Sequence, residues 1–413
     1  MSSNGSPLGT NQLVNHFAIF GTHPRLSLAE FHCIKPRCDA PNLLGTAALF
    51  HDLDWDGDVL MNVLGGTVKL GDIVFTISGR ELDLEKLVEA LAPFLARPSI
   101  DFGWTVYGGS SETNRKISKL AIPFKKRLKA HDISARWVTG KEGTITPAAV
   151  AKLKLTTDGL DLCIFLDGDQ LHVGRTTNVQ DADAWSLRDY GRPARNERVG
   201  MLPPKLARMM VNLAQTPAGT TLWDPFCGGG TVMMEAALAT EAGTIIGSDL
   251  DDTQVGNAQK NTAWLTAQGI FRPMDAQRTV IFQSDARSVK PSHKGKIDAI
   301  VTEGYLGPLL SGQETKATLD KNVRDITKLW EESLKAWKPI LSKTARLVCI
   351  WPAFKTSHGI ARVDLETQLP ALGYQLTNPL AGWDDSNGPL LYARPEQRVM
   401  RRIVVLEPIS NNR

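Results

Sequence analysis

A glycine-rich turn stands between an apolar run and a helical pattern in Leu222–Leu238, which reads LWDPFCGGGTVMMEAAL. Gly228, Gly229 and Gly230 let a ligand approach the backbone closely and can adopt positive φ. Thr231 opens the predicted helix, whose first amide groups and dipole face the same spot. We expect this turn to hold a cofactor through Asp224, Phe226, Gly228, Gly230 and Thr231.

Two acids follow at the ends of the next two predicted strands. Asp249 suits a ribose diol, because one carboxylate can accept hydrogen bonds from both hydroxyls. Asp285, followed by Ala286, could accept from an adenine amino group. Together with the glycine turn, these residues predict an adenosine site. Because the Gly-x-Gly-x-x-Gly pattern is absent, the sequence favours S-adenosylmethionine over NAD. A turn that merely packs a helix on a strand is the alternative interpretation.

A further acid and an aromatic ring follow the apolar run 299–301, which predicts a buried strand. Glu303 and Tyr305 come directly after that strand. Open α/β sheets bind ligands at the carboxyl ends of their strands, so we expect both side chains to face a ligand. An ordinary packing role is the alternative for Tyr305.

The cysteines indicate neither a disulfide framework nor a metal site, because they are scattered, odd in number and form no CxxC pair. This favours a cytoplasmic location. A nucleophilic role for Cys227 is conceivable chemically, but its place in the glycine turn favours packing. No apolar run approaches the length of a membrane span. Residues 1–12 do not resemble a signal peptide and predict a mobile tail.

The order of predicted strands and helices indicates the fold that positions the site residues. Residues 205–413 alternate strands and helices, which predicts βαβ units and a parallel sheet, with an antiparallel hairpin appended near the end. Mixed strands and helices up to about residue 181 predict one or two small α/β domains. Residues 186–204 are turn-rich and charged, and we interpret them as a linker.

Residues 115–154 hold eleven Lys and Arg but only two acids, although the whole chain has a formal net charge of only +3. This excess predicts a surface for a polyanion; a solvated helix face is the alternative. The apolar spacing around Lys125 and Lys126 predicts an amphipathic helix, which Pro123 would kink or divide into two pieces.

These motifs, DPFCGGGTVMMEAAL, IGSDLDD, SDA and DAIVTEGY, resemble the THUMP-bearing class I RNA methyltransferases, and in particular the tRNA guanine-10 N2-methyltransferase family. The resemblance covers nearly the whole chain. It implies a ferredoxin-like α+β domain at 13–95, a THUMP-like RNA-binding domain at 96–185 and a Rossmann-like methyltransferase domain at 205–413.

The resemblance also implies the chemistry. THUMP domains dock on tRNA, so the phosphate contacts expected from it are Lys125, Lys126, Arg127, Lys129 and Arg136, with Arg192 and Arg195 in the linker. The catalytic domain of the family flips a guanine into its pocket and holds the exocyclic amine with an Asp or Asn, two prolines and an aromatic residue. The side-chain oxygen and a carbonyl turn the amine lone pair toward the methyl group, and transfer is governed by positioning.

This chain departs from that motif, with Glu303, Gly304, Tyr305 and Leu306 where Asp or Asn, two prolines and an aromatic residue are expected. Glu303 and Tyr305 are nevertheless the expected catalytic residues of a tRNA guanine N2-methyltransferase. The alternatives are an amino-methyltransferase for another RNA or DNA base, and a tRNA-binding protein that keeps the cofactor fold with weak or no catalysis. The expected partners are tRNA and, as a further candidate, a small activator subunit.

Overall fold

The computed structural model describes residues 14–79, 81–140, 143–195, 201–288, 296–312, 314–356, 359–384, 386 and 388–409. The chain divides into two compact units. The first unit comprises residues 1–24, 37–62 and 67–182, and the second comprises 25–36, 63–66 and 183–413. The predicted tail, residues 1–12, lies outside the described residues. No described helix is both long and apolar enough to cross a membrane.

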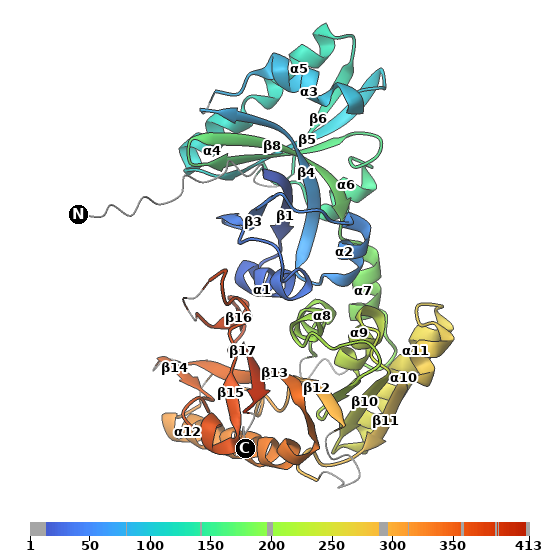
Figure 1. Ribbon diagram of the computed structural model, residues 1–413, viewed down its shortest axis with the longest axis vertical. Coiled ribbons are helices and arrows are strands. Elements are labelled where there is room, and N and C mark those ends of the chain that lie inside the picture. Colours follow the sequence, from blue (N-terminus) through green and yellow to red (C-terminus); the bar gives the residue numbers. More distant parts are fainter. Residues whose placement is uncertain are drawn as a thin grey trace, which may run out of the picture. The chain divides into compact units, whose positions relative to one another are not determined.

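The first unit is built on one eight-stranded sheet of order β2-β3-β1-β4-β8-β7-β5-β6 (Figure 1). Its strands are β1 (Val14–Phe20), β2 (Asn42–Leu44), β3 (Ala47–His51), β4 (Thr67–Ser78), β5 (Ser99–Gly108), β6 (Ser134–Val138), β7 (Leu160–Asp167) and β8 (Gln170–Val179). Because β4 pairs with β8 from Lys69 to Ser78, the sheet continues across the domain boundary expected at residues 95 and 96. The two expected domains therefore share one sheet.

The helices of the first unit are α2 (Gly57–Val63, whose last residue belongs to the second unit), α3 (Leu84–Leu91), α4 (Ser111–Ser118), α5 (Ala121–Ala130) and α6 (Pro147–Lys152). The predicted basic helix is thus in two pieces, α4 and α5. Pro123 lies in the first turn of α5, where a backbone N–H has no helical acceptor to lose. Phe124 of α5 is fully buried and packs on Phe102 and Trp104 of β5.

The second unit is a nine-stranded sheet whose main order is β11-β10-β9-β12-β13-β17-β15, with β14 paired to β13 and β16 to β17. The first five strands are parallel, whereas β17 runs antiparallel to β13. The strands are β9 (Thr221–Asp224), β10 (Thr244–Asp249), β11 (Thr279–Gln283), β12 (Ile297–Thr302), β13 (Leu341–Thr356), β14 (Gly359–Arg362), β15 (Tyr374–Leu376), β16 (Leu390–Tyr392) and β17 (Val399–Pro408). The predicted parallel sheet with appended antiparallel strands is confirmed.

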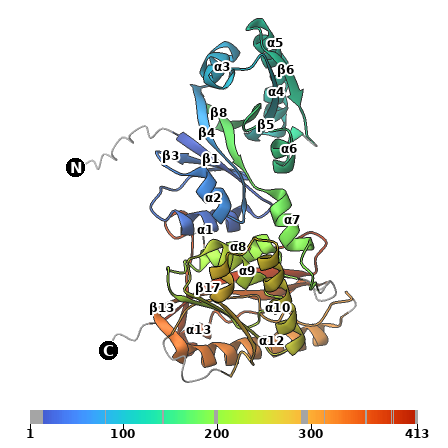
Figure 2. The same cartoon turned by 90° about the vertical axis from the view of Figure 1, so that its right-hand side faces the viewer.

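Helices cover both faces of this sheet: α8, α9 and α10 lie on one side and α12 on the other (Figures 1 and 2). The helices are α1 (Pro24–Ile34), α7 (Ala182–Tyr190), α8 (Pro204–Leu213), α9 (Thr231–Ala239), α10 (Asp252–Ala267), α11 (Pro273–Gln277), α12 (Lys316–Trp337) and α13 (Leu369–Leu372). Trp330 and Trp337 of α12 are buried against Trp223 of β9 and Cys349 of β13. Of the predicted linker, residues 186–190 are helical and residues 196–200 lie outside the described residues.

Helix α1 belongs to the second unit, although the sequence places it in the expected domain 13–95. Buried Glu30 accepts hydrogen bonds from the amides of Gly65 and Gly66 at 2.7 and 2.8 Å, and from Asn212 of α8 at 2.6 Å. His32 stacks on Trp383, with ring centroids 4.3 Å apart. The expected first domain is therefore not contiguous.

Candidate cofactor and base-binding site

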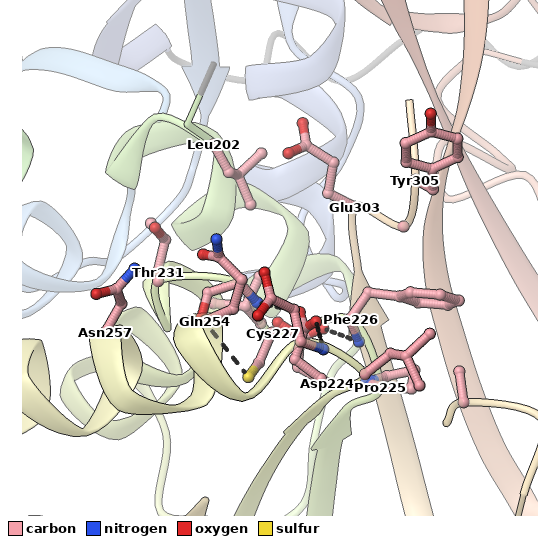
Figure 3. Close-up of a pocket in the computed structure, with 18 of the residues that line it drawn as sticks. Leu202, Asp224, Pro225, Phe226, Cys227, Thr231, Gln254, Asn257, Glu303 and Tyr305 are labelled. Atoms are coloured by element: carbon pink, nitrogen blue, oxygen red, sulfur yellow. Dashed lines mark hydrogen bonds between the residues drawn. The ribbon is translucent and has the colours of Figure 1, made fainter. Parts of the chain in front are cut away.

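A cavity of about 590 Å³ opens at the carboxyl ends of β9, β10, β11 and β12 in the second unit (Figure 3). It is the size of a typical small-ligand site. The expected residues that line it are Asp224, Phe226, Gly228, Thr231, Asp249, Asp285, Ala286, Glu303 and Tyr305. Parallel strands bring their carboxyl ends to one edge of a sheet, which is why residues so far apart in sequence meet here.

The glycine turn has the backbone that its sequence predicts. Gly228 and Gly230 have φ of +50° and +83°. A Cβ added at Gly228 would meet no described atom within 4 Å, so this side of the turn leaves open space. Gly230 does not line the cavity but caps α9 without a side chain, and a Cβ there would lie 3.1 Å from the Cβ of Ala258. The first amide groups of α9 therefore have no side-chain cap.

Asp249 holds the turn from the end of β10. Its Oδ2 accepts from the Gly228 amide at 2.9 Å, and its Oδ1 accepts from the Asp251 amide at 3.0 Å. A carboxylate has about four lone-pair sites, so each oxygen keeps capacity for a further donor. The expected contact with a ribose diol is compatible with this arrangement.

Asp285 is already held by Arg287, a contact that the sequence reasoning did not identify. The Arg287 guanidinium donates to both Asp285 oxygens, with Nη2 2.7 Å from Oδ2, and also reaches Glu332 at 3.1 Å. Hydrogen bonds from Arg287 hold the pKa of Asp285 below its usual value. The expected contact of Asp285 with an adenine amino group stays a prediction, and it would have to use the lone pairs that Arg287 leaves.

Acidic groups gather on one side of the cavity. Asp224 is 2% exposed, and its Oδ1 accepts from the Phe226 amide at 3.2 Å. Burial, together with the nearby charges of Asp249 and Glu303, raises the pKa of Asp224 to about 7, against the hydrogen bond from the Phe226 amide. Asp249 and Glu303 thus act on Asp224, and a cluster of carboxyl groups favours a ligand with positive charge.

Glu303 lies in the cavity but is held by a partner from a distant strand. Its Oε1 accepts from Nε of Arg401 on β17 at 2.5 Å, and the two side chains are 16% and 7% exposed. Burial raises the pKa of Glu303, and the charge of Arg401 opposes that rise. Tyr305 is 51% exposed, and its ring points away from the Glu303 carboxylate (Figure 3). This ring is accessible for stacking.

The position of Arg192 does not fit the phosphate contact that the sequence predicts. It is 2% exposed and lines the cavity, and its Nη1 donates to Oγ1 of Thr231 at 2.5 Å. Asn261 of α10 fixes Ala194, two residues further along, because its amide exchanges two hydrogen bonds with the Ala194 backbone at 2.9 and 3.0 Å. A side chain this deeply buried cannot form a surface contact, so we place Arg192 in the cavity wall.

The other residues expected to contact RNA lie on the surface. Lys125, Lys126, Arg127 and Lys129 of α5 and Arg136 of β6 are exposed in the first unit, and Arg195 is exposed in the second. Arg127 pairs with Glu85 at 3.2 Å and Arg136 pairs with Asp101, which reduces their free charge. Within the described residues, Lys125, Lys126 and Lys129 have no ion-pair partner. Their role in RNA binding stays a prediction.

Cys227 has the features of a packing residue. It is 5% exposed, and burial raises the pKa of its thiol far above the usual value, which keeps the thiol protonated. Among the described residues, no group of three or more His, Cys, Asp and Glu side chains is arranged to hold a metal ion. Sequence reasoning also missed Leu202, Gln254 and Asn257, which line the cavity from α10 and from the segment before α8 (Figure 3).

Residues 192–359 match the family model described as RMKL-like, methyltransferase domain. A tRNA (guanine(10)-N2)-dimethyltransferase of Methanothermobacter thermautotrophicus is 38% identical over 108 residues, which are 26% of this chain and 28% of that enzyme. The enzyme of the same name from Methanocaldococcus jannaschii is 28% identical over 179 residues, 40% of this chain and 45% of that enzyme. The matched part of the chain thus spans less than half the length of these curated relatives.

Two solved structures resemble nearly the whole chain. TrmN from Thermus thermophilus has a TM-score of 0.52 at 18% identity, over 95% of this chain and 99% of that one. A possible methylase from Clostridium difficile 630 has a TM-score of 0.50 at 12% identity, over 97% and 99%. These likenesses show the fold. The family match covers residues 192–359, less than half of this chain, and the likeness of fold extends over nearly all of it.

Proposed function

We propose that this chain transfers a methyl group from S-adenosylmethionine to the exocyclic N2 amine of a guanine in tRNA. The observation that carries the proposal is that one cavity joins the residues suited to adenosine with Glu303 and Tyr305. The names of the two archaeal relatives favour the same substrate. The scattered cysteines favour the cytoplasm as its location.

The cavity fits S-adenosylmethionine by its charge and by its open turn. Asp249 would hold the ribose, and Asp285 and Ala286 the adenine. The open space beside Gly228 lets the cofactor lie against the backbone. A cationic ligand would favour the ionised forms of the carboxyl groups of Asp224 and Asp249 in this cavity. When bound, the cofactor supplies an electrophilic methyl group on a positively charged sulfur.

The protein's own part in the reaction is to position the amine. Glu303 would accept one N–H of the guanine amine through the oxygen that Arg401 leaves, which turns the nitrogen lone pair out of conjugation with the ring. Tyr305, which is half exposed, would stack on the base. Arg401 fixes the Glu303 carboxylate and opposes the rise of its pKa that burial causes. The exposed lysines of α5 would contact tRNA phosphates.

The residue roles can be tested by methyl transfer from labelled S-adenosylmethionine into unmodified tRNA. We expect Glu303→Ala to lower kcat roughly 100-fold, the scale of a positioned group that acts on the transferred amine. We expect Tyr305→Ala to lower kcat/KM about 10- to 100-fold and Tyr305→Phe, which keeps the stacking ring, to stay close to the wild type. Full activity of Glu303→Ala would contradict the assignment.

The same assay separates the alternatives. Transfer into duplex DNA but not tRNA would favour another base as substrate. Binding of tRNA and cofactor without transfer would favour a binding protein, and transfer restored by a cell extract would point to the candidate activator subunit.

A further inference from the structure

The loop that follows β12 carries an apolar tip next to the cofactor cavity. Its first residues, Glu303, Gly304 and Tyr305, line that cavity (Figure 3). Pro308 and Leu309 follow in the same loop and are exposed, and Leu309 has 72% of its surface exposed, the largest fraction among the large apolar residues that the structure describes. A single exposed leucine needs no explanation, but three exposed apolar side chains within five residues beside a cavity indicate a contact surface.

The tip lies within reach of the RNA that the proposed function requires. Leu309 is four residues beyond Tyr305, and four residues of chain span at most about 14 Å. In the proposed function the Tyr305 ring stacks on a guanine that has left its own stack. The RNA segment that supplies this guanine therefore has to pass close to Leu309.

The core of the second unit holds the loop on both sides of the tip. Gly307 has φ of +92°, and a Cβ added there would lie 3.1 Å from Cδ1 of Ile326, a buried residue of α12. Leu310 packs against the apolar core. Between them, the ring of Pro308 fixes the backbone φ. A tip that is anchored in this way loses little conformational entropy when it contacts a ligand.

The charges beside the tip suit a polyanion. Arg398 is exposed, and its Nη1 donates to the carbonyl of Leu310 at 3.2 Å. Lys355 is also exposed, and its amide donates to the Arg398 carbonyl at 2.8 Å. Neither cation has an ion-pair partner among the residues that the structure describes. The nearest acid in sequence, Glu314, accepts from the Gly312 amide at 2.9 Å and so holds the loop itself. An apolar tip beside free cations fits a nucleic acid better than the apolar surface of a protein.

We propose that Leu309, supported by Pro308, is a wedge that enters the RNA stack when the target guanine turns out into the cavity. Proteins that unstack nucleic acids insert apolar side chains of this kind between bases. Leu309 would contact the bases on either side of the vacated position, and Arg398 and Lys355 would contact neighbouring phosphates. The wedge replaces part of the stacking that the flipped base gives up, which favours the flipped state. The proposal rests on the proposed function and adds that the target guanine is stacked in a helix before it reacts.

Single-turnover methyl transfer into two transcripts tests this proposal. The labelled guanine is first located in tRNA by ribonuclease mapping. The first transcript is the unmodified tRNA, and the second lacks the nucleotide that pairs with this guanine, so that turning the base out costs little. We expect Leu309→Ala to be about 10- to 100-fold slower than the wild type on the first transcript and within about threefold of it on the second.

Two further variants complete the design. Leu309→Met keeps an apolar side chain of similar volume and should retain most of the wild-type rate on both transcripts. Met274→Ala removes an exposed apolar side chain from α11, next to the edge strand β11, and should leave both rates unchanged. Thermal unfolding of the three variants checks that each is folded.

Several outcomes would overturn the proposal. Equal slowing of Leu309→Ala on both transcripts would mean a structural role or a contact with the methylated base itself. Wild-type rates of Leu309→Ala on both transcripts would assign the exposed tip to another partner, such as a protein. A label on a guanine that is already unstacked in the folded tRNA would leave no stack for a wedge to enter. A wild type that transfers no methyl group into tRNA would instead refute the proposed function.

Discussion

At the scale of single residues, the ion pair of Glu303 with Arg401 decides how the candidate catalytic carboxylate behaves. Both side chains are largely buried, so removal of one leaves an uncompensated charge in the other. Arg401 opposes the burial that raises the pKa of Glu303. The ionised form, which is the better acceptor for an amine, therefore depends on a residue of another strand.

We predict that Arg401→Gln shifts the acid limb of the kcat profile toward higher pH. Without the guanidinium the pKa of Glu303 rises further, so Glu303 stays protonated at pH values where the wild type is already ionised. The measurement is kcat for methyl transfer across the neutral and alkaline range. Arg402→Gln is the matched control, because Arg402 is the next residue on β17 and pairs with Glu366 instead. Coincident profiles for Arg401→Gln and the wild type would refute this role.

Sequence reasoning could find the residues that strands and turns position, but not those that tertiary contacts bring in. Asp249 was predictable because a parallel strand must end beside the glycine turn. Arg401 was not, since it approaches from an antiparallel strand 98 positions away. Arg192 was misplaced on the surface for the same reason, because its burial depends on how Asn261 joins its segment to the turn.

At the scale of elements, the loop after β12 explains why the first of the two expected prolines is missing. Gly304 has φ of +69°, which proline cannot adopt. A Cβ at this position would lie 2.5 Å from Cζ2 of Trp330, a buried residue of α12. The loop therefore passes closer to α12 than any side chain at Gly304 would allow. The altered motif is a consistent local structure rather than a random loss of residues.

Gly304→Ala should lower the free energy of unfolding by about 1–3 kcal/mol more than Gly269→Ala. Gly269 is a matched control, because it has the same φ of +69° but no described atom within 4 Å of an added Cβ. The difference between the two variants isolates the overlap with Trp330. Denaturant unfolding of both proteins measures it. Equal destabilisation would show that the loop moves away from α12 at no cost.

At the scale of the whole molecule, the alternation of strands and helices was sufficient to predict the parallel sheet of the second unit. The membership of α1 in that unit was not predictable, because Glu30 and Asn212 are 182 positions apart. Nor was the single sheet of the first unit, since the pairing of β4 with β8 joins segments that look like separate domains. Such long-range pairings leave no local pattern in the sequence.

The first unit allows a prediction about RNA binding. We expect the triple variant with Lys125, Lys126 and Lys129 changed to Gln to bind tRNA more weakly. Its affinity should also depend less on salt. The slope of log affinity against log salt concentration should fall in magnitude by about 0.7 to 0.9 for each phosphate that is no longer neutralised. The measurement is tRNA affinity at several salt concentrations. The control changes three exposed lysines of the second unit, Lys321, Lys335 and Lys343, and should leave the slope unchanged. Equal slopes for both triple variants would assign tRNA binding to another surface.

The central claim is tested most directly by the chemical identity of the methylated nucleoside. The wild-type protein is incubated with unmodified tRNA and labelled S-adenosylmethionine, and the RNA is digested to nucleosides that are separated by chromatography. We predict that the label appears in N2-methylguanosine or its dimethylated form and is strongly reduced with Glu303→Ala. Label in a different nucleoside, or no label while tRNA and cofactor both remain bound, would contradict the account.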